Sequence, residues 1–181
     1  ILATAGSNSS TSINFELVRY TVSLIEGHQV ETRDLSKEDF PMYSKDLEDA
    51  HGIPPGIEGL HKRLREADGL VLSVNEHNGN PSAFTKNLLD WLSRKDRKFL
   101  EGLPILLLSA SGGKRGAQSS REVVAKMITR FGAEVAAQWS LPSYYDNFDP
   151  EKGITDPELL EDHGRASVSY THLRAHETDS Y

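Results

Sequence analysis

Residues 1–14 read ILATAGSNSSTSIN, and this stretch determines the expected fold. Residues 1–5 form a short apolar run typical of a buried strand, and residues 12–26 carry apolar side chains at helical spacing. A serine-rich loop joins the two. Parallel sheets are built from strands that lead through a polar loop into a helix, so the chain opens as an α/β protein.

The rest of the chain repeats this alternation of strand and helix. Further strands are predicted at residues 29–35, 70–74, 104–109 and 134–141. Helices are predicted at 57–67, 81–94, 117–131 and from 156 to about 165, with Pro81 in a first turn and Gly132 as a stop signal. Residues 36–56 form a long irregular loop, which is uncommon unless it has a function. We therefore expect an α/β fold with a doubly wound, five-stranded parallel sheet and helices on both faces.

Composition excludes several classes of function. The chain has a formal net charge of -7 and no cysteine. An acidic chain without clustered Lys and Arg binds nucleic acid poorly, and the lack of cysteine excludes disulfides and zinc–cysteine sites. No apolar segment is long enough to cross a bilayer, and the start shows neither a signal-peptide pattern nor a methionine, so a few residues are expected to be missing there. We expect a cytoplasmic protein with no nucleic acid partner and no membrane partner.

The end of the chain differs from the rest. We expect one domain over residues 1–166, followed by SVSYTHLRAHETDSY at 167–181, which has little apolar periodicity. We interpret this tail as foreign or frame-shifted sequence appended to a truncated domain, and a genuine polar or disordered tail is the alternative. No function is placed there, and His172 and His176 are discounted as ligands.

The loop after the first strand, residues 6–14, brings hydroxyl groups and free backbone N–H groups to the start of a helix. The positive end of the helix dipole favours an anion there, and phosphate is the usual ligand. The spacing matches neither the G-x-G-x-x-G dinucleotide motif nor a Walker A loop. The alternative is a serine-rich loop that only caps the helix.

Two more loops of this kind follow later strands. Residues 73–81 place polar turn residues after the third strand, suited to holding a flat heterocycle, although an ordinary strand-to-helix turn is the alternative. Glu76 and His77 within it suggest a metal or an acid–base pair, but adjacent residues seldom converge on one ligand, and we predict no metal. Glycines at 109–116, after the fourth strand, allow close approach to a ligand or form a flexible connection. All three loops lie at the edge of the sheet where such folds bind ligands.

The motifs resemble those of the NADPH-dependent FMN reductases, which include quinone, chromate and azo-dye reductases, over about residues 1–165. That family opens with a Gly-Ser loop ending in Ser-x-Asn, matched by residues 6–7 and 12–14, although Ser9 stands where the family often has Arg. Its Pro-Glu-Tyr-Asn-Gly turn and Lys-Asn…Asp-Trp helix are matched by NEHNG at 75–79 and by residues 86–91. Its third motif, Ser followed by glycines, is matched at 111–113.

The resemblance implies a flavodoxin-like fold that holds FMN and takes hydride from NADPH or NADH. By a ping-pong reaction it would reduce quinones, flavins or a similar small-molecule electron acceptor. The cofactor performs the chemistry, so no side chain is assigned as a catalytic acid or base. A homodimer or homotetramer is also implied, with residues 36–56 reaching a neighbour. The residues expected to contact FMN are Ser7, Ser9, Ser12, Ile13, Asn14, Asn75, Glu76, His77, Asn78, Gly79, Ser111, Gly112 and Gly113.

Two other functions fit the same motifs. One is a flavodoxin-type electron carrier, which binds FMN without oxidising NAD(P)H. The other is a non-catalytic flavin- or phosphate-binding module. The aromatic residues Tyr43, Tyr144, Tyr145 and Phe148 are expected to cover the flavin, form a subunit contact or belong to the core.

Overall fold

We describe a computed structural model of residues 1–178, with side chains through Thr171. Its strands are β1 (Leu2–Gly6), β2 (Glu31–Arg33), β3 (Leu70–Val74), β4 (Glu76–His77), β5 (Asn80–Pro81), β6 (Pro104–Ala110), β7 (Glu134–Leu141), β8 (Phe148–Asp149) and β9 (Gly153–Ile154). Its helices are α1 (Ile13–Ser23), α2 (Lys45–His51), α3 (Pro55–Glu66), α4 (Ala83–Lys95), α5 (Gln118–Ile128), α6 (Tyr144–Asn147) and α7 (Pro157–Thr178), with 3₁₀ turns η1 (Leu35–Lys37) and η2 (Thr129–Phe131).

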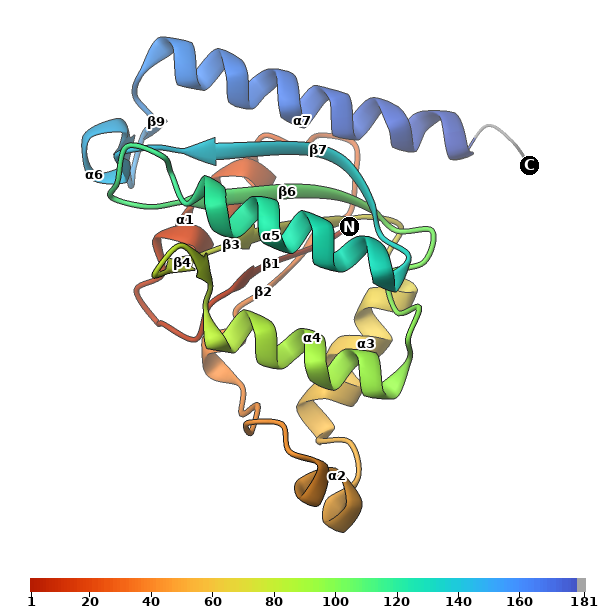
Figure 1. Cartoon of the computed structure of the whole chain (residues 1–181). Helices are drawn as coiled ribbons and strands as arrows, with labels where there is room; N and C mark the ends of the chain where they lie inside the picture. Colours follow the sequence, from red (N-terminus) through yellow and green to blue (C-terminus); the bar gives the residue numbers. More distant parts are fainter. Residues whose placement is uncertain (179–181) are drawn as a thin grey trace.

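The main sheet is parallel, with the strand order β2-β1-β3-β6-β7 (Figure 1). The chain runs outward from β1 to β2 and then crosses to β3 on the other side of β1. The direction of winding therefore reverses between β1 and β3. This arrangement confirms the predicted flavodoxin-like, doubly wound sheet, in which ligands bind beyond the carboxyl ends of the strands at the reversal.

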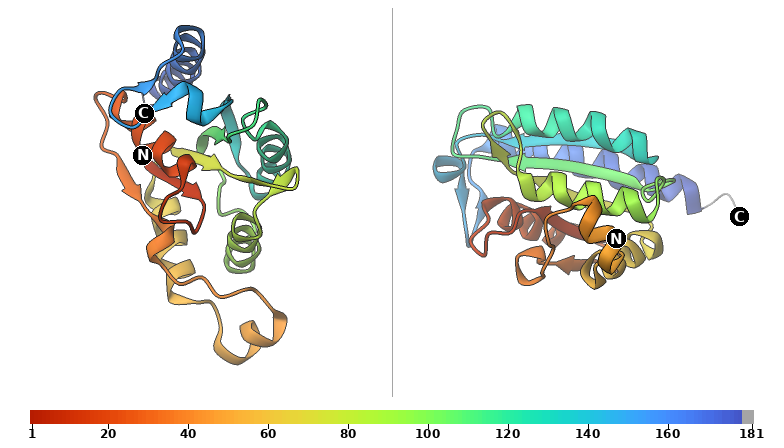
Figure 2. Two further views of the ribbon diagram at one scale, coloured as in Figure 1. Left: turned by 90° about the vertical axis from the view of Figure 1, so that its left-hand side faces the viewer. Right: turned by 60° about the horizontal axis from the view of Figure 1, so that its bottom comes forward.

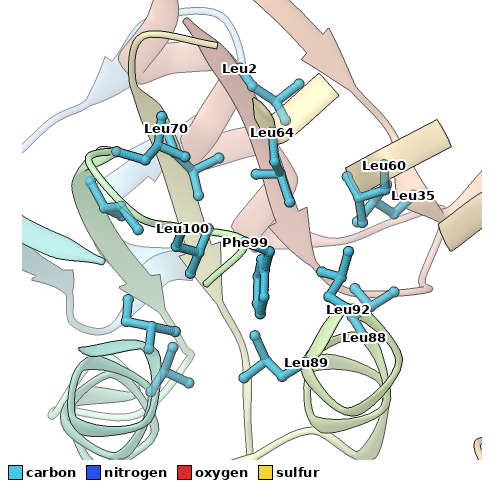
Figure 3. Packing of buried hydrophobic residues seen from close by; sticks show 14 of the residues in the cluster. Leu2, Leu35, Leu60, Leu64, Leu70, Leu88, Leu89, Leu92, Phe99 and Leu100 are labelled. Carbon is cyan, nitrogen blue, oxygen red and sulfur yellow. The ribbon is translucent and has the colours of Figure 1, made fainter. Parts of the chain in front are cut away.

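Helices cover both faces of this sheet. Helices α3, α4 and α5 pack on one face, and α1 and α7 pack on the other (Figures 1 and 2). Figure 3 shows leucines of α3 and α4, among them Leu64 and Leu89, gathered around Phe99 in the first of these layers. All residues of β6 are buried, as expected for a central strand with helices on both sides.

Residues 39–54, which we call the arm, stand away from the body of the molecule (Figures 1 and 2). Their base is fixed to α4, because the side chains of Asn87 and Trp91 both donate hydrogen bonds to the carbonyl of Pro41, at 2.9 and 2.8 Å. The prediction of an irregular loop over residues 36–56 is wrong, because this range contains the end of η1 and all of α2. Helix α2 buries no residue and so shows no apolar face in the sequence, but Ser44 caps its start by accepting from the N–H of Leu47 at 3.1 Å.

Two further predictions are corrected near α4 and α7. Pro81 lies in β5 and not in the first turn of α4, whose N-cap is Ser82. The last helix does not end near Arg165 but continues to Thr178, and Tyr170 is fully buried in the core. The apolar signal is weak because the face turned to the sheet carries Leu159, His163, Ala166 and Tyr170 in place of large aliphatic residues.

The expected tail at 167–181 is therefore helical as far as Thr178. Its interpretation as foreign sequence stays a prediction. The imidazoles of His172 and His176 lie outside the side chains that the structure describes.

His163 is a buried titratable group beneath α7. Its ring is fully covered, lies 4.9 Å from that of Trp139 between centroids, and shares a 2.9 Å hydrogen bond with the hydroxyl of Thr21. Burial lowers the pKa of His163 from 6.5 to about 4. The folded protein therefore resists protonation at a pH where the unfolded chain accepts the proton.

We expect the protein to lose stability as the pH falls from about 6.5 towards about 4. Between these values the unfolded state binds more protons at His163 than the folded state, so protonation favours unfolding. The free energy of unfolding should fall by about 1.4 kcal/mol per pH unit from this group. Urea titrations at pH 7 and pH 5 measure the effect, and His163→Gln should shrink the difference by roughly 2 kcal/mol. If the free energy of unfolding fell equally between pH 7 and pH 5 in the variant and in the wild type, His163 would not be the cause of the pH dependence.

Candidate functional site

The start of α1 lies beyond the carboxyl end of β1. Ser12 is the N-cap, and its hydroxyl accepts from the N–H of Phe15 at 3.3 Å. The first N–H groups of a helix have no partner within it, which leaves those of Ile13 and Asn14 for a ligand. Their partial positive charge adds to that of the helix dipole, so this end of α1 suits an anion.

Asn14 is buried, and its side-chain amide joins three elements of the fold. Its Oδ1 accepts from the N–H of Ala110 and from the hydroxyl of Ser73, each at 2.8 Å, and its Nδ2 donates to the carbonyl of Ala110 at 3.1 Å. These bonds hold the start of α1 against β3 and β6. The side-chain amide of Asn14 is therefore occupied within the fold, which leaves the backbone N–H of Asn14 for the predicted contact with FMN.

The loop after β3 is tied to the start of α5. The hydroxyl of Ser120 donates to the carbonyl of Asn75 at 2.6 Å, and the N–H of Ser120 donates to the carboxylate of Glu76 at 3.1 Å. Glu76 thus holds the loop in place. Asn78 and Gly79 form the tight turn of the β4–β5 hairpin, and both have positive φ, at 53° and 73°.

Glycines at the end of β6 allow close packing beside this loop. A side chain at Gly112 would meet the ring of Tyr145 at 3.1 Å, and one at Gly116 would meet the backbone of Leu141 at 2.6 Å. Tyr145 is 77% exposed and stands over Gly112. Tyr144, behind it, is buried, and this burial, with a smaller effect from the charge of Glu16, raises its pKa to about 12.

These loops enclose an open hollow of about 250 Å³, which we call the strand-end hollow. Its lining comes from the ends of β1, β3 and β6 and the start of α1: Ser7, Ser9, Thr11, Ser12, Ile13, Asn14, Asn75, Glu76, Ala110, Ser111, Gly112 and Tyr145. The structure therefore brings most of the predicted cofactor residues together. His77, Asn78, Gly79 and Gly113 lie outside the lining, and His77 is exposed on the hairpin.

Sequence reasoning missed Thr11 and Ala110 and left Tyr145 undecided. The hydroxyl of Thr11 lies 3.3 Å from that of Ser9, and Ala110 is the last residue of β6. Of the four aromatic candidates, Tyr144 and Phe148 belong to the core and Tyr43 packs against Trp91, which leaves Tyr145 at the hollow. Its exposure and its close approach to Gly112 distinguish Tyr145 from the other three, and only the fold reveals both.

Backbone strain gathers around the same edge of the sheet. Among residues 1–178, the non-glycine residues with positive φ are Asn78, Ala117 and Ser143, which follow β3, β6 and β7. Such conformations are costly and cluster at functional sites. Within the described side chains, no three His, Asp or Glu residues gather as metal ligands.

A larger hollow, of about 580 Å³, lies at the opposite edge of the sheet, around Leu2, Gln29 and Arg63. It faces the amino ends of the strands, where this fold class does not bind ligands. The larger volume of this hollow is therefore not evidence of a ligand site. The donor groups that line the strand-end hollow favour that hollow instead.

Comparison with known proteins identifies the family. The sequence profile of the NADPH-dependent FMN reductases matches residues 1–146. The chain belongs to this family. It is 32% identical over 117 residues to an NAD(P)H-dependent FMN reductase of Pseudomonas aeruginosa, covering 64% of this chain and 62% of that protein. It is 37% identical over 78 residues to a quinone reductase of Escherichia coli K12, covering 43% and 42%.

The matched segments thus span less than two thirds of either relative. Among solved structures, the flavoenzyme NAD(P)H:(acceptor) oxidoreductase FerB of Paracoccus denitrificans superposes with a TM-score of 0.73 at 22% identity, over 94% of each chain. At that identity the likeness shows the fold.

No helix within residues 1–178 is long and apolar enough to span a bilayer.

We expect Asn14→Ala to reduce the free energy of unfolding by about 3 kcal/mol, because it leaves the buried N–H and carbonyl of Ala110 and the hydroxyl of Ser73 without this partner. Ser12→Ala, which removes only a helix cap, should cost about 1 kcal/mol. Urea unfolding of both variants compares them directly. A loss for Asn14→Ala no larger than that for Ser12→Ala would show that this amide does not hold the site together.

Proposed function

We propose that the chain is an FMN-dependent NAD(P)H oxidoreductase that reduces quinones, flavins or similar small acceptors by a ping-pong reaction in the cytoplasm. The observation that carries the proposal is the start of α1. It places free N–H groups and serine hydroxyls in the strand-end hollow, at the reversal of winding between β1 and β3.

The residues present fit the two ends of FMN. The N–H groups of Ile13 and Asn14, with the hydroxyls of Ser7, Ser9 and Ser12, suit the phosphate. Among the side chains described, through Thr171, no Lys or Arg lines the hollow, so neutral donors and the dipole of α1 would hold the phosphate charge.

The flavin ring would lie along the loops after β3 and β6. Ser120 fixes the carbonyl of Asn75 and the side-chain carboxylate of Glu76 there, and the missing side chain at Gly112 leaves space beside Tyr145. Bound FMN would supply the redox chemistry, and the chain would bind and orient it. Burial raises the pKa of Tyr144 to about 12, so its phenol keeps its proton well above neutral pH.

The phosphate assignment predicts a specific loss of affinity. Ser12→Ala should weaken FMN binding roughly ten- to a hundredfold, since a hydrogen bond to a charged partner contributes about 1.5–3 kcal/mol. Fluorescence quenching of FMN measures the dissociation constant. Ser44→Ala is the matched control, because Ser44 caps α2 with the same geometry, far from the hollow.

Both variants should lose similar stability and only Ser12→Ala should lose FMN. If both bind FMN as the wild type does, Ser12 is merely a cap and the phosphate does not contact it.

The activity itself is tested by NAD(P)H oxidation with a quinone acceptor and added FMN. Turnover that requires FMN supports a reductase. Tight FMN binding without NAD(P)H oxidation would instead identify a flavodoxin-type carrier. An absence of FMN binding would leave the non-catalytic phosphate-binding alternative.

We propose that two or four copies of the chain associate and that the arm takes part. Met42, on the arm, is 65% exposed, and no residue of α2 is fully buried within its own chain. Closed two-fold pairing is the commonest arrangement of soluble oligomers. Light scattering should give a multiple of the 20.1 kDa chain mass.

Met42→Lys should shift this mass towards one chain at low concentration. Leu24→Lys is its control, since Leu24 is 50% exposed at the end of α1, away from the arm. One chain mass for the wild type at every concentration would contradict the proposal.

A further inference from the structure

A groove of about 420 Å³, which we call the α4–α5 groove, lies between these two helices. Apolar side chains of α4, α5 and η2 line it, among them Leu89, Met127 and Phe131. Val123 of α5 belongs to the same lining and is 37% exposed. The groove therefore presents apolar surface that its own chain leaves uncovered, and it suits an apolar side chain of a partner.

The charges around the α4–α5 groove are mainly basic. Its lining includes Lys86, Lys126 and Arg130, together with the carboxylate of Asp90. Lys86 pairs with Asp90 at 2.5 Å. Lys126 and Arg130 are exposed, and neither forms an ion pair with any side chain through Thr171. The groove thus has two free cations beside its apolar surface, and this combination favours an acidic partner.

The arm of this chain carries the complementary features. Met42 is 65% exposed. Asp46, in the first turn of α2, is exposed and forms no ion pair with the described side chains, whereas Glu48 and Asp49 of the same helix pair with basic residues. The arm therefore offers an exposed apolar side chain and a free carboxylate one helical turn apart.

The arm and the groove lie on different sides of α4 in the same chain. Asn87 and Trp91 fasten the base of the arm to α4 through the carbonyl of Pro41. Lys86 and Asp90 line the groove instead. Accordingly, α4 lies between α5 and the arm (Figures 1 and 2). Since each copy carries both surfaces, two copies related by a two-fold axis can exchange their arms reciprocally.

We propose that the α4–α5 groove receives the arm of a second copy of this chain, with Met42 on its apolar surface and Asp46 beside the two free cations. This inference rests on the association proposed above and adds the surface that the arm occupies. Charge complementarity selects the arm over a basic partner. Two copies of an acidic chain, each with a net charge of -7, repel each other at long range, and the contact of Asp46 with free cations offsets this locally.

Charge reversal on either surface tests the proposal. The groove variant carries Lys126→Glu and Arg130→Glu, and the arm variant carries Asp46→Lys. Each variant alone places like charges opposite each other, so the dissociation constant for self-association should rise roughly tenfold or more in sedimentation velocity runs. The control carries Lys152→Glu and Lys114→Glu, two exposed positions outside the groove with the same change of charge as the groove variant, and should associate as the wild type does.

Mixing the groove variant with the arm variant gives the sharpest readout. In a mixed pair the acidic groove faces the basic arm, and the unchanged groove faces the unchanged arm. The mixture should therefore associate within about threefold of the wild type, although each variant alone does not. Far-UV circular dichroism verifies that both variants are folded.

Two results would overturn the inference alone. A groove variant that associates as tightly as the wild type would mean that the arm docks elsewhere and that the groove fits a different acidic partner. A mixture as weak as either variant would mean that the two surfaces do not meet. A wild-type protein with one chain mass at every concentration would overturn the proposed association, and the inference with it, while FMN binding would remain a separate result.

Discussion

The buried amide of Asn14 is the interaction on which the site depends. It connects the first residues of α1 to β3 through Ser73 and to β6 through Ala110. These contacts set where the start of the helix lies relative to two strand ends. Without them the free N–H groups of α1 would have no fixed relation to the loops after β3 and β6. The amide thus converts three separate loops into one hollow.

A second set of contacts completes the hollow from the other side. Ser120 at the start of α5 holds the loop after β3, and Asn87 and Trp91 of α4 hold the base of the arm. In the family's motifs, Asn14, Glu76, Asn87 and Trp91 therefore fix loops through their side chains. In this chain the side chains of the motif residues mainly hold backbone groups in position. The backbone N–H groups at the start of α1 would then bind a phosphate without a charged side chain.

Much of this architecture follows from the sequence because the central strands are buried on both faces. The apolar run at 70–74 predicts β3 with its observed bounds, and the alternation of strands and helices predicts the winding of the sheet. The prediction was weaker where burial is partial. β2 is an edge strand with exposed residues, α2 has no fully buried residue, and the core face of α7 carries polar and small side chains.

That these loops meet at one hollow was predictable, whereas the part each residue plays in it was not. The partners of Asn14 are 59 and 96 residues away in the chain, so its structural role has no local signal. The same holds for Tyr145, whose position over Gly112 depends on the fold. The spacing of strands and loops along the sequence predicts which loops meet. Only the tertiary contacts distinguish the side chains that hold these loops from those that would face a ligand.

The central claim is that the start of α1 binds the phosphate of FMN, and comparing FMN with riboflavin in the wild-type protein tests it most directly. The two molecules share the flavin ring and differ only in the phosphate. Titration by fluorescence quenching should show riboflavin binding at least roughly tenfold more weakly than FMN, because it lacks the charged hydrogen-bond acceptor. Equal affinities would contradict the account, since the phosphate would then make no contact with the helix.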